Sequence, residues 1–200
     1  IIEQGMIRFH HLLITAALCA SPTISLAEEA KKFYVTGSIG YSQISGMDYQ
    51  LPGGRFVMVP DGNVGTELGV GYDFGSLRME ATWDRAFADG GSTGSAEWND
   101  DVVMNGYLGS LYLDFENESK WTPFIGGSIG ILSANIGDDY TTSSPIYYGI
   151  QGGISYATSD SIDIYAKASY LKADSVDFGV DATDWNFGSY AARFGARFKF

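Results

Sequence analysis

The sequence predicts an all-β protein: an eight-stranded, antiparallel, up-and-down β-barrel that crosses a membrane. Apolar and polar residues alternate with a period of two over eight segments, which is the pattern of strands with two unlike faces. The connections between these segments are alternately long and short, as in bacterial outer-membrane barrels. Aromatic residues stand at both ends of the apolar faces, as expected at two membrane–water interfaces.

The N-terminal segment predicts export. A basic start, an apolar run at 12–20 and small residues before a cleavage site after Ala27 are the three parts of a secretory signal. The apolar run is too short to cross a bilayer as a helix, and the alternative is a buried N-terminal helix. We therefore expect an upstream extension at 1–5, a signal peptide at 6–27 and the barrel at 28–200.

Composition excludes several kinds of chemistry from the predicted barrel segment. Cys19, His10 and His11 are the only cysteine and histidines of the chain, and all three lie in the predicted signal. We therefore expect no disulfide, no catalytic residue, no metal site and no cofactor. The formal net charge is −12, and it is unchanged without residues 1–27, which hold one acidic and one basic residue. Such an acidic chain is not expected to bind nucleic acid.

Each of the eight segments has one apolar face. In the third segment, for example, Leu77 and Met79 share this face and Arg78 lies on the other. Glycine replaces a larger residue at several positions of these faces. In chain order, and at every second residue, the apolar faces run from Phe33 to Tyr41, Thr66 to Tyr72, Leu77 to Trp83, Tyr107 to Phe115, Ile125 to Ile131, Ile146 to Tyr156, Ile162 to Tyr170 and Tyr190 to Phe200.

The connections predict which end of the barrel faces outward. Short periplasmic turns and long outer loops are typical of this class, so the long connections are expected outside the cell. These long connections carry twelve acidic and three basic residues and are expected to be solvated; calcium binding is the alternative, although no EF-hand pattern is present. The long connections are 43–63, 85–101, 134–144 and 172–184, and the short ones are 74–76, 116–120 and 158–161.

Two aromatic girdles distinguish a transmembrane barrel from a soluble one, which would turn its apolar face inward. Ten residues separate Tyr190 from Phe200, which at the usual strand rise and tilt is about 25 Å, the height of the apolar band. The expected interface aromatics are Phe33, Tyr72, Phe115, Tyr156 and Phe200 at the short-turn end, and Tyr41, Trp83, Tyr107, Tyr148, Tyr170 and Tyr190 at the other.

The opposite faces predict a charged lumen. A barrel of eight strands is filled by its own inward side chains, and buried charges need partners. We expect a structural cluster of ion pairs that closes the barrel, with a narrow pore gated by the same pairs as the alternative. Its expected members are Glu67, Asp73, Arg78, Glu80, Asp84, Asp114, Asp163, Lys167, Arg193, Arg197 and Lys199.

Five stretches together resemble the opacity-type, OmpA-like family of eight-stranded outer-membrane barrels. They are GVGYDFGSLRMEATW (69–83), LYLDF (111–115), TPFIGGSIGI (122–131), GGISYATSDSIDIYAKASYL (152–171) and FGARFKF (194–200). The resemblance implies a monomer in the outer membrane of a Gram-negative bacterium, and it implies no single activity. The final Phe200 resembles the C-terminal signal that the barrel assembly machinery reads. Small barrels that are enzymes use a histidine as general base, which the predicted barrel segment lacks, so no enzyme is expected.

The sequence therefore predicts a structural outer-membrane barrel that stabilises the envelope and displays acidic surface loops. The alternatives are an adhesin or host-interaction protein that acts through those loops, and a narrow gated ion pore. The expected partners are outer-membrane lipid and lipopolysaccharide, the assembly machinery through the C-terminal strand, and, for the adhesin alternative, a host surface molecule.

Overall fold

The computed structural model describes residues 32–45, 47–51, 54–93, 96–136, 140–141, 144–176 and 183–200. The predicted upstream extension and signal peptide lie outside these residues and stay predictions. Within the described ranges, no helix is long and apolar enough to cross a membrane. The strands are β1 (Phe33–Ile44), β2 (Met47–Leu51), β3 (Gly54–Pro60), β4 (Asn63–Asp73), β5 (Leu77–Thr93), β6 (Ala96–Asp114), β7 (Trp121–Ile136), β8 (Tyr140–Thr141), β9 (Ile146–Ser159), β10 (Ile162–Val176) and β11 (Thr183–Lys199).

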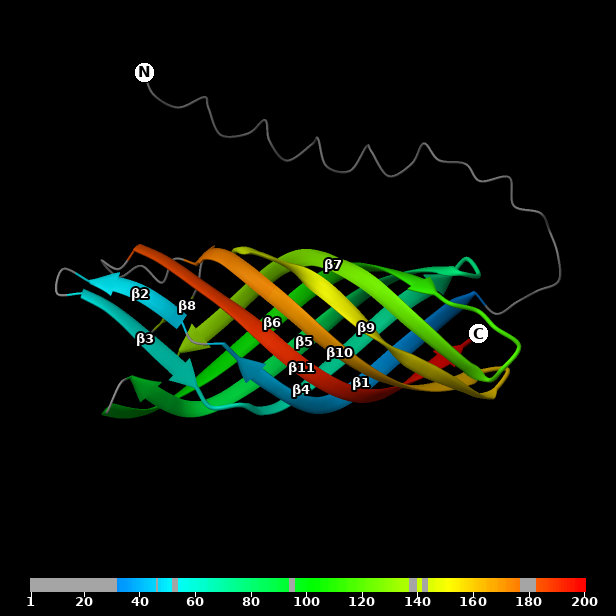
Figure 1. Ribbon diagram of the computed structural model, residues 1–200, viewed down its shortest axis with the longest axis horizontal. Helices are drawn as coiled ribbons and strands as arrows, with labels where there is room; N and C mark the ends of the chain where they lie inside the picture. Colours follow the sequence, from blue (N-terminus) through cyan, green and yellow to red (C-terminus); the bar gives the residue numbers. More distant parts are fainter. Residues whose placement is uncertain are drawn as a thin grey trace, which may run out of the picture. The chain divides into compact units, whose positions relative to one another are not determined.

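Eight of these strands form a closed antiparallel barrel, which confirms the predicted fold. The pairs run in the order β1, β4, β5, β6, β7, β9, β10 and β11 (Figure 1). The last strand returns to the first, from Tyr34 opposite Lys199 to Ile44 opposite Ser189. Closure leaves no strand edge unpaired in the bilayer, where an unsatisfied backbone group would cost several kcal/mol.

The short connections are tight turns at the end of the barrel where β1 begins and β11 ends. The amide of Phe200 donates to the carbonyl of Phe33 at 2.9 Å. In the turn at 74–76, Gly75 has a φ of 101°, a backbone conformation that favours glycine. The amide of Gly75 donates to Asp73 Oδ1 at 2.8 Å, so Asp73, expected in the lumen cluster, also holds this turn.

At the opposite end, strands replace much of the expected loop structure (Figure 1). The hairpin β2–β3 lies within the first long connection. Strand β2 pairs with β11, and strand β3 pairs with β5. Beyond the ends of β1 and β4, the hairpin thus fills the gap in the wall between β11 and β5. The prediction of a long loop at 85–101 is wrong, because β5 continues to Thr93 and β6 begins at Ala96. The barrel wall therefore continues well beyond the outer aromatic girdle.

Candidate functional site

The outer wall of the barrel is an apolar band. Its outward side chains are strongly exposed; Phe194 is 74% exposed and Ile150 and Ile129 are each 63% exposed. An apolar surface that surrounds a barrel between two aromatic girdles is suited to lipid and not to water. This outward orientation is opposite to that of a soluble barrel.

The predicted interface aromatics lie on this outer wall. Eight of them are exposed and three, namely Tyr72, Trp83 and Tyr156, are partly exposed. Aromatic pairs form across neighbouring strands: Phe33 packs on Tyr72 with ring centroids 4.8 Å apart, and Tyr170 packs on Tyr190 at 4.7 Å. The exposed ones are Phe33, Tyr41, Tyr107, Phe115, Tyr148, Tyr170, Tyr190 and Phe200.

Trp121 is a girdle residue that the sequence reasoning missed. It begins β7 at the short-turn end, is 51% exposed, and packs on Tyr156 with ring centroids 4.7 Å apart. The available signal was its position directly after a short connection, on the outward parity of β7. The apolar face predicted for that segment begins at Ile125, so it does not reach this aromatic end.

The inward side chains of the short-turn half are charged and paired. One network centres on Glu67, which accepts hydrogen bonds from Lys167 Nζ at 2.6 and 2.8 Å. Arg193 contacts Glu67 at 3.4 Å and forms two hydrogen bonds with Asp84. Ser42 Oγ accepts a further hydrogen bond from Arg193 at 3.1 Å. These pairs are both buried and hydrogen-bonded, and separating them would leave an uncompensated buried charge.

Two further ion-pair groups lie closer to the short turns. Arg78 donates to both oxygens of Asp114 at 2.5 and 2.9 Å, a bidentate pair. Asp163 accepts from Arg197 at 3.2 Å and from Lys199 at 3.0 Å. The structure thus places all the predicted lumen residues inside or at the mouth of the barrel, and it joins all of them except Glu80 and Asp73 in ion pairs.

Glu80 is the exception among the buried carboxylates. It is 7% exposed, and its carboxylate makes no direct ion pair or hydrogen bond within the described part of the chain. It borders a lumen cavity of about 10 Å³ together with Arg78, Lys167 and Arg197. That volume is about enough for one water molecule, which could link the carboxylate to these cations.

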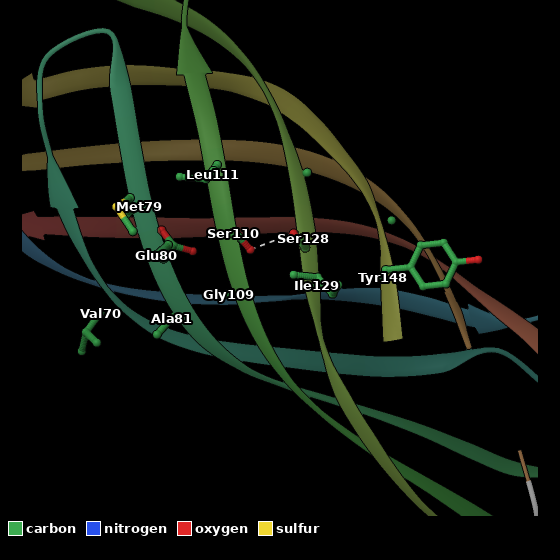
Figure 2. Close-up of a pocket in the computed structure, with 12 residues that line it drawn as sticks. Val70, Met79, Glu80, Ala81, Gly109, Ser110, Leu111, Ser128, Ile129 and Tyr148 are labelled. Atoms are coloured by element: carbon green, nitrogen blue, oxygen red, sulfur yellow. Dashed lines mark hydrogen bonds between the residues drawn. The ribbon is translucent and has the colours of Figure 1, made fainter. Parts of the chain in front are cut away.

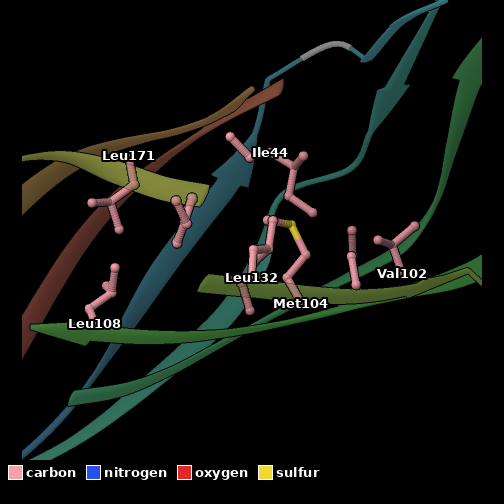
Figure 3. Packing of buried hydrophobic residues seen from close by; sticks show 11 residues of the cluster. Ile44, Val102, Met104, Leu108, Leu132 and Leu171 are labelled. Atoms are coloured by element: carbon pink, nitrogen blue, oxygen red, sulfur yellow. The ribbon is translucent and has the colours of Figure 1, made fainter. Parts of the chain in front are cut away.

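A buried apolar layer fills the lumen at the long-connection end (Figure 3). The inward positions change from charged or polar to apolar along several strands; on β5, for example, Asp84 is followed by Ala86 and Ala88. The sequence reasoning missed this layer, because it read each strand only as far as its girdle aromatic. All members are 3% exposed or less: Ile44, Ala86, Ala88, Val102, Met104, Leu108, Leu132, Ala134, Tyr147, Leu171 and Ala173.

At the level of the outer aromatic girdle, the outward positions change from apolar to polar. Beyond the girdle, the outward positions are largely polar and partly exposed, whereas below it they are apolar. The strands therefore have membrane-protein faces below the outer girdle and soluble-protein faces above it. We call the outward polar positions the polar collar: Gln43, Arg85, Asn105, Ser133, Asn135 and Lys172.

A shallow depression of about 850 Å³ lies on the outer wall over β5, β6 and β7 (Figure 2). Gly109 and Gly127 have no side chain to fill it, and Met79, Leu111 and Ile129 border it. Ser110 and Ser128 alternate with these residues and form a 2.7 Å hydrogen bond inside the lumen. The depression therefore offers apolar contact, as the rest of the lipid-facing wall does.

No group of three or more histidine, cysteine, aspartate or glutamate residues in the described ranges is placed to hold a metal ion. The acidic residues of the predicted long connections fall almost entirely outside the side chains that the structure describes. Asp61 is the exception, and it is exposed. Solvation of these acidic residues and calcium binding by them therefore stay predictions.

Residues 12–198 match the model of the outer membrane protein beta-barrel domain. A closed barrel with a lipid-facing wall and a filled lumen defines the class, a transmembrane barrel of the Gram-negative outer membrane. The chain belongs to the outer membrane protein beta-barrel family. No curated protein matches it in sequence.

Several solved structures share the fold. The crystal structure of Neisserial surface protein A has a TM-score of 0.65 and 22% identity, covering 86% of this chain and 100% of that one. The NMR structure of the outer membrane protein AlkL in lipid bilayers has a TM-score of 0.56 and 13% identity, covering 90% and 96%. Likeness at such identities shows the fold and assigns no activity.

Proposed function

We propose that this protein is a structural barrel of the outer membrane, closed to ions, that stabilises the envelope and holds its acidic connections outside the cell. The observation that carries the proposal is the filling of the lumen. A buried apolar layer lies above a layer of ion pairs, so a hydrated ion would have to cross both. An apolar constriction alone opposes ion entry by excluding water.

The test is conductance across a planar bilayer that contains the purified barrel. We expect a silent bilayer, with folding confirmed by heat-dependent mobility on a gel. Stable, discrete openings that change on Glu80→Gln would contradict the closed barrel and favour the narrow pore. Glu80 suits this purpose because it is the buried lumen carboxylate without a direct ion pair in the described part of the chain.

The second candidate is an adhesin or host-interaction protein. It is favoured by the wall beyond the outer girdle, where β5 and β6 continue and the hairpin β2–β3 replaces β1 and β4. A strand extension of this kind would hold the connecting segments away from the membrane surface. Binding of cells that display the protein to host cells, lost when 47–60 is replaced by a short turn, would support this candidate; equal binding would reject it.

A further inference from the structure

The polar collar contains an arginine whose charge is not neutralised within the described part of the chain. Arg85 lies on β5, two residues beyond the girdle residue Trp83, on the outward face. It forms no ion pair or hydrogen bond with the described residues, and its Nε is buried without a partner. By contrast, the lumen cations Arg78, Lys167, Arg193 and Arg197 each contact a carboxylate.

Aromatic rings hold this guanidinium in place. Its central carbon lies 4.8 Å from the ring centroid of Phe87 and 6.0 Å from that of Trp83. These contacts restrict the side chain without satisfying its hydrogen-bond donors. The cation is therefore positioned on the wall with its two terminal nitrogens, and not its buried Nε, as the donors for a ligand.

The neighbouring strands add polar groups and no described acid. Thr66 on β4 and Asn105 on β6 lie opposite Arg85 in register. Asn105 Oδ1 accepts a hydrogen bond from Trp83 Nε1 at 3.2 Å, which leaves the side-chain NH₂ of Asn105 as a donor. Arg85, Asn105 and Thr66 thus form a row of donors on the outer wall.

The height of this row matches a lipid headgroup. Trp83 belongs to the outer girdle, and two further residues along a tilted strand rise by about 5 Å. Short turns lie on the periplasmic side of such barrels, so the row faces the outer leaflet. Lipid phosphates lie just beyond the hydrocarbon, and an arginine fork binds phosphate through two parallel hydrogen bonds.

We propose that Arg85 and Asn105, with Trp83 and Phe87 as supporting rings, bind a phosphate group of lipopolysaccharide in the outer leaflet. The proposal deepens the expected contact with outer-membrane lipid by assigning residues to it. It does not depend on whether the lumen conducts ions. The chain carries a formal net charge of −12, so a local cationic site would favour close contact with an anionic lipid.

The test is binding of diphosphoryl lipid A to the detergent-solubilised barrel, measured by native mass spectrometry. We expect Arg85→Gln to weaken binding about tenfold, since a charge-assisted bidentate contact is lost. The matched control is Lys120→Gln, which removes the same charge from an exposed turn at the opposite end and should change binding by less than about twofold. Heat-dependent gel mobility confirms that both variants are folded.

Three outcomes would overturn the proposal. They are equal binding by Arg85→Gln, an equal loss with Lys120→Gln, and equal binding of lipid A stripped of its phosphates. A measurement on the unaltered protein gives an answer even if Arg85→Gln does not fold. Raising the salt concentration should weaken the binding of diphosphoryl lipid A but not that of the phosphate-free form; identical salt responses would also reject the site.

Discussion

At the scale of the residue, several charged side chains in the lumen contact more than one partner of opposite charge. Glu67 accepts from Lys167 and also contacts Arg193, which in turn binds Asp84. These side chains come from β4, β10, β11 and β5, so a few carboxylates connect strands on several sides of the barrel. Loss of one member therefore affects more than one neighbour.

We expect Glu67→Ala to lower the free energy of unfolding by about 3–5 kcal/mol, because it leaves the buried Lys167 without its carboxylate. The measurement is urea unfolding of the barrel in lipid vesicles, followed by tryptophan fluorescence. Glu116→Ala, an exposed turn position, is the control and should change stability by about 0.5 kcal/mol or less. Similar losses in the two variants would contradict a structural role for the network.

At the scale of the element, several long strands exchange their polar and apolar faces along their length. On β6, Tyr112 and Ser110 face the ion-paired half of the lumen, whereas Met104 and Val102 face the apolar layer. The alternation of period two continues through this change, but the apolar residues move to the inward face. Because of this exchange, one continuous apolar face predicts strands that are shorter than the observed ones.

The adjacent valines of β6 test the apolar layer. Val102 is 2% exposed inside the layer, whereas Val103 lies on the outward face and is partly exposed. We expect Val102→Ala to cost about 1–3 kcal/mol through lost burial and a residual cavity. Val103→Ala, the matched control, should cost about 0.5 kcal/mol or less in the same unfolding measurement. Equal costs would show that the layer is not packed as described.

At the scale of the whole molecule, the outer wall changes from apolar to polar and the lumen from charged to apolar at one level. These two changes define where the bilayer ends. Below the outer girdle the wall is apolar and the lumen charged; above it the collar is polar and the lumen apolar. If the hydrocarbon ends at the outer girdle, the apolar wall below it faces lipid and the polar collar above it faces headgroups and water. The protein is thus a membrane barrel whose wall continues outward and, at the described positions just beyond the girdle, has a polar outer face and an apolar inner face.

Cysteine labelling checks this boundary. The single cysteine of the chain, Cys19, lies in the predicted signal, so introduced cysteines can be read individually in the barrel. With the barrel in lipid vesicles, we expect Ser133→Cys to react with a water-soluble maleimide and Ile129→Cys to be protected. Both positions are outward on β7, and Ile129 is 63% exposed to the lipid band. Protection at both positions would place the boundary farther out, and reaction at both would place it farther in.

Parts of the candidate site were readable from the sequence. The inward parity of Glu67, Arg193 and Arg197 follows from alternation with the apolar face, and no tertiary information is needed for it. Which cation meets which carboxylate was not readable. Glu67 and Lys167 lie on strands that are not neighbours, so their contact depends on how the lumen is filled.

The sequence by itself determined the strand faces, the two aromatic girdles and the eight-stranded barrel, because a period of two and the alternating connection lengths are local signals. Only the tertiary structure decided the ion pairs, the apolar layer, the place of β2–β3 in the wall and the lack of a carboxylate partner for Arg85 among the described residues. These features depend on contacts across the lumen and between strands far apart in the chain. The physical reason is that alternation fixes the direction of a side chain, whereas its partner is fixed only when the barrel closes.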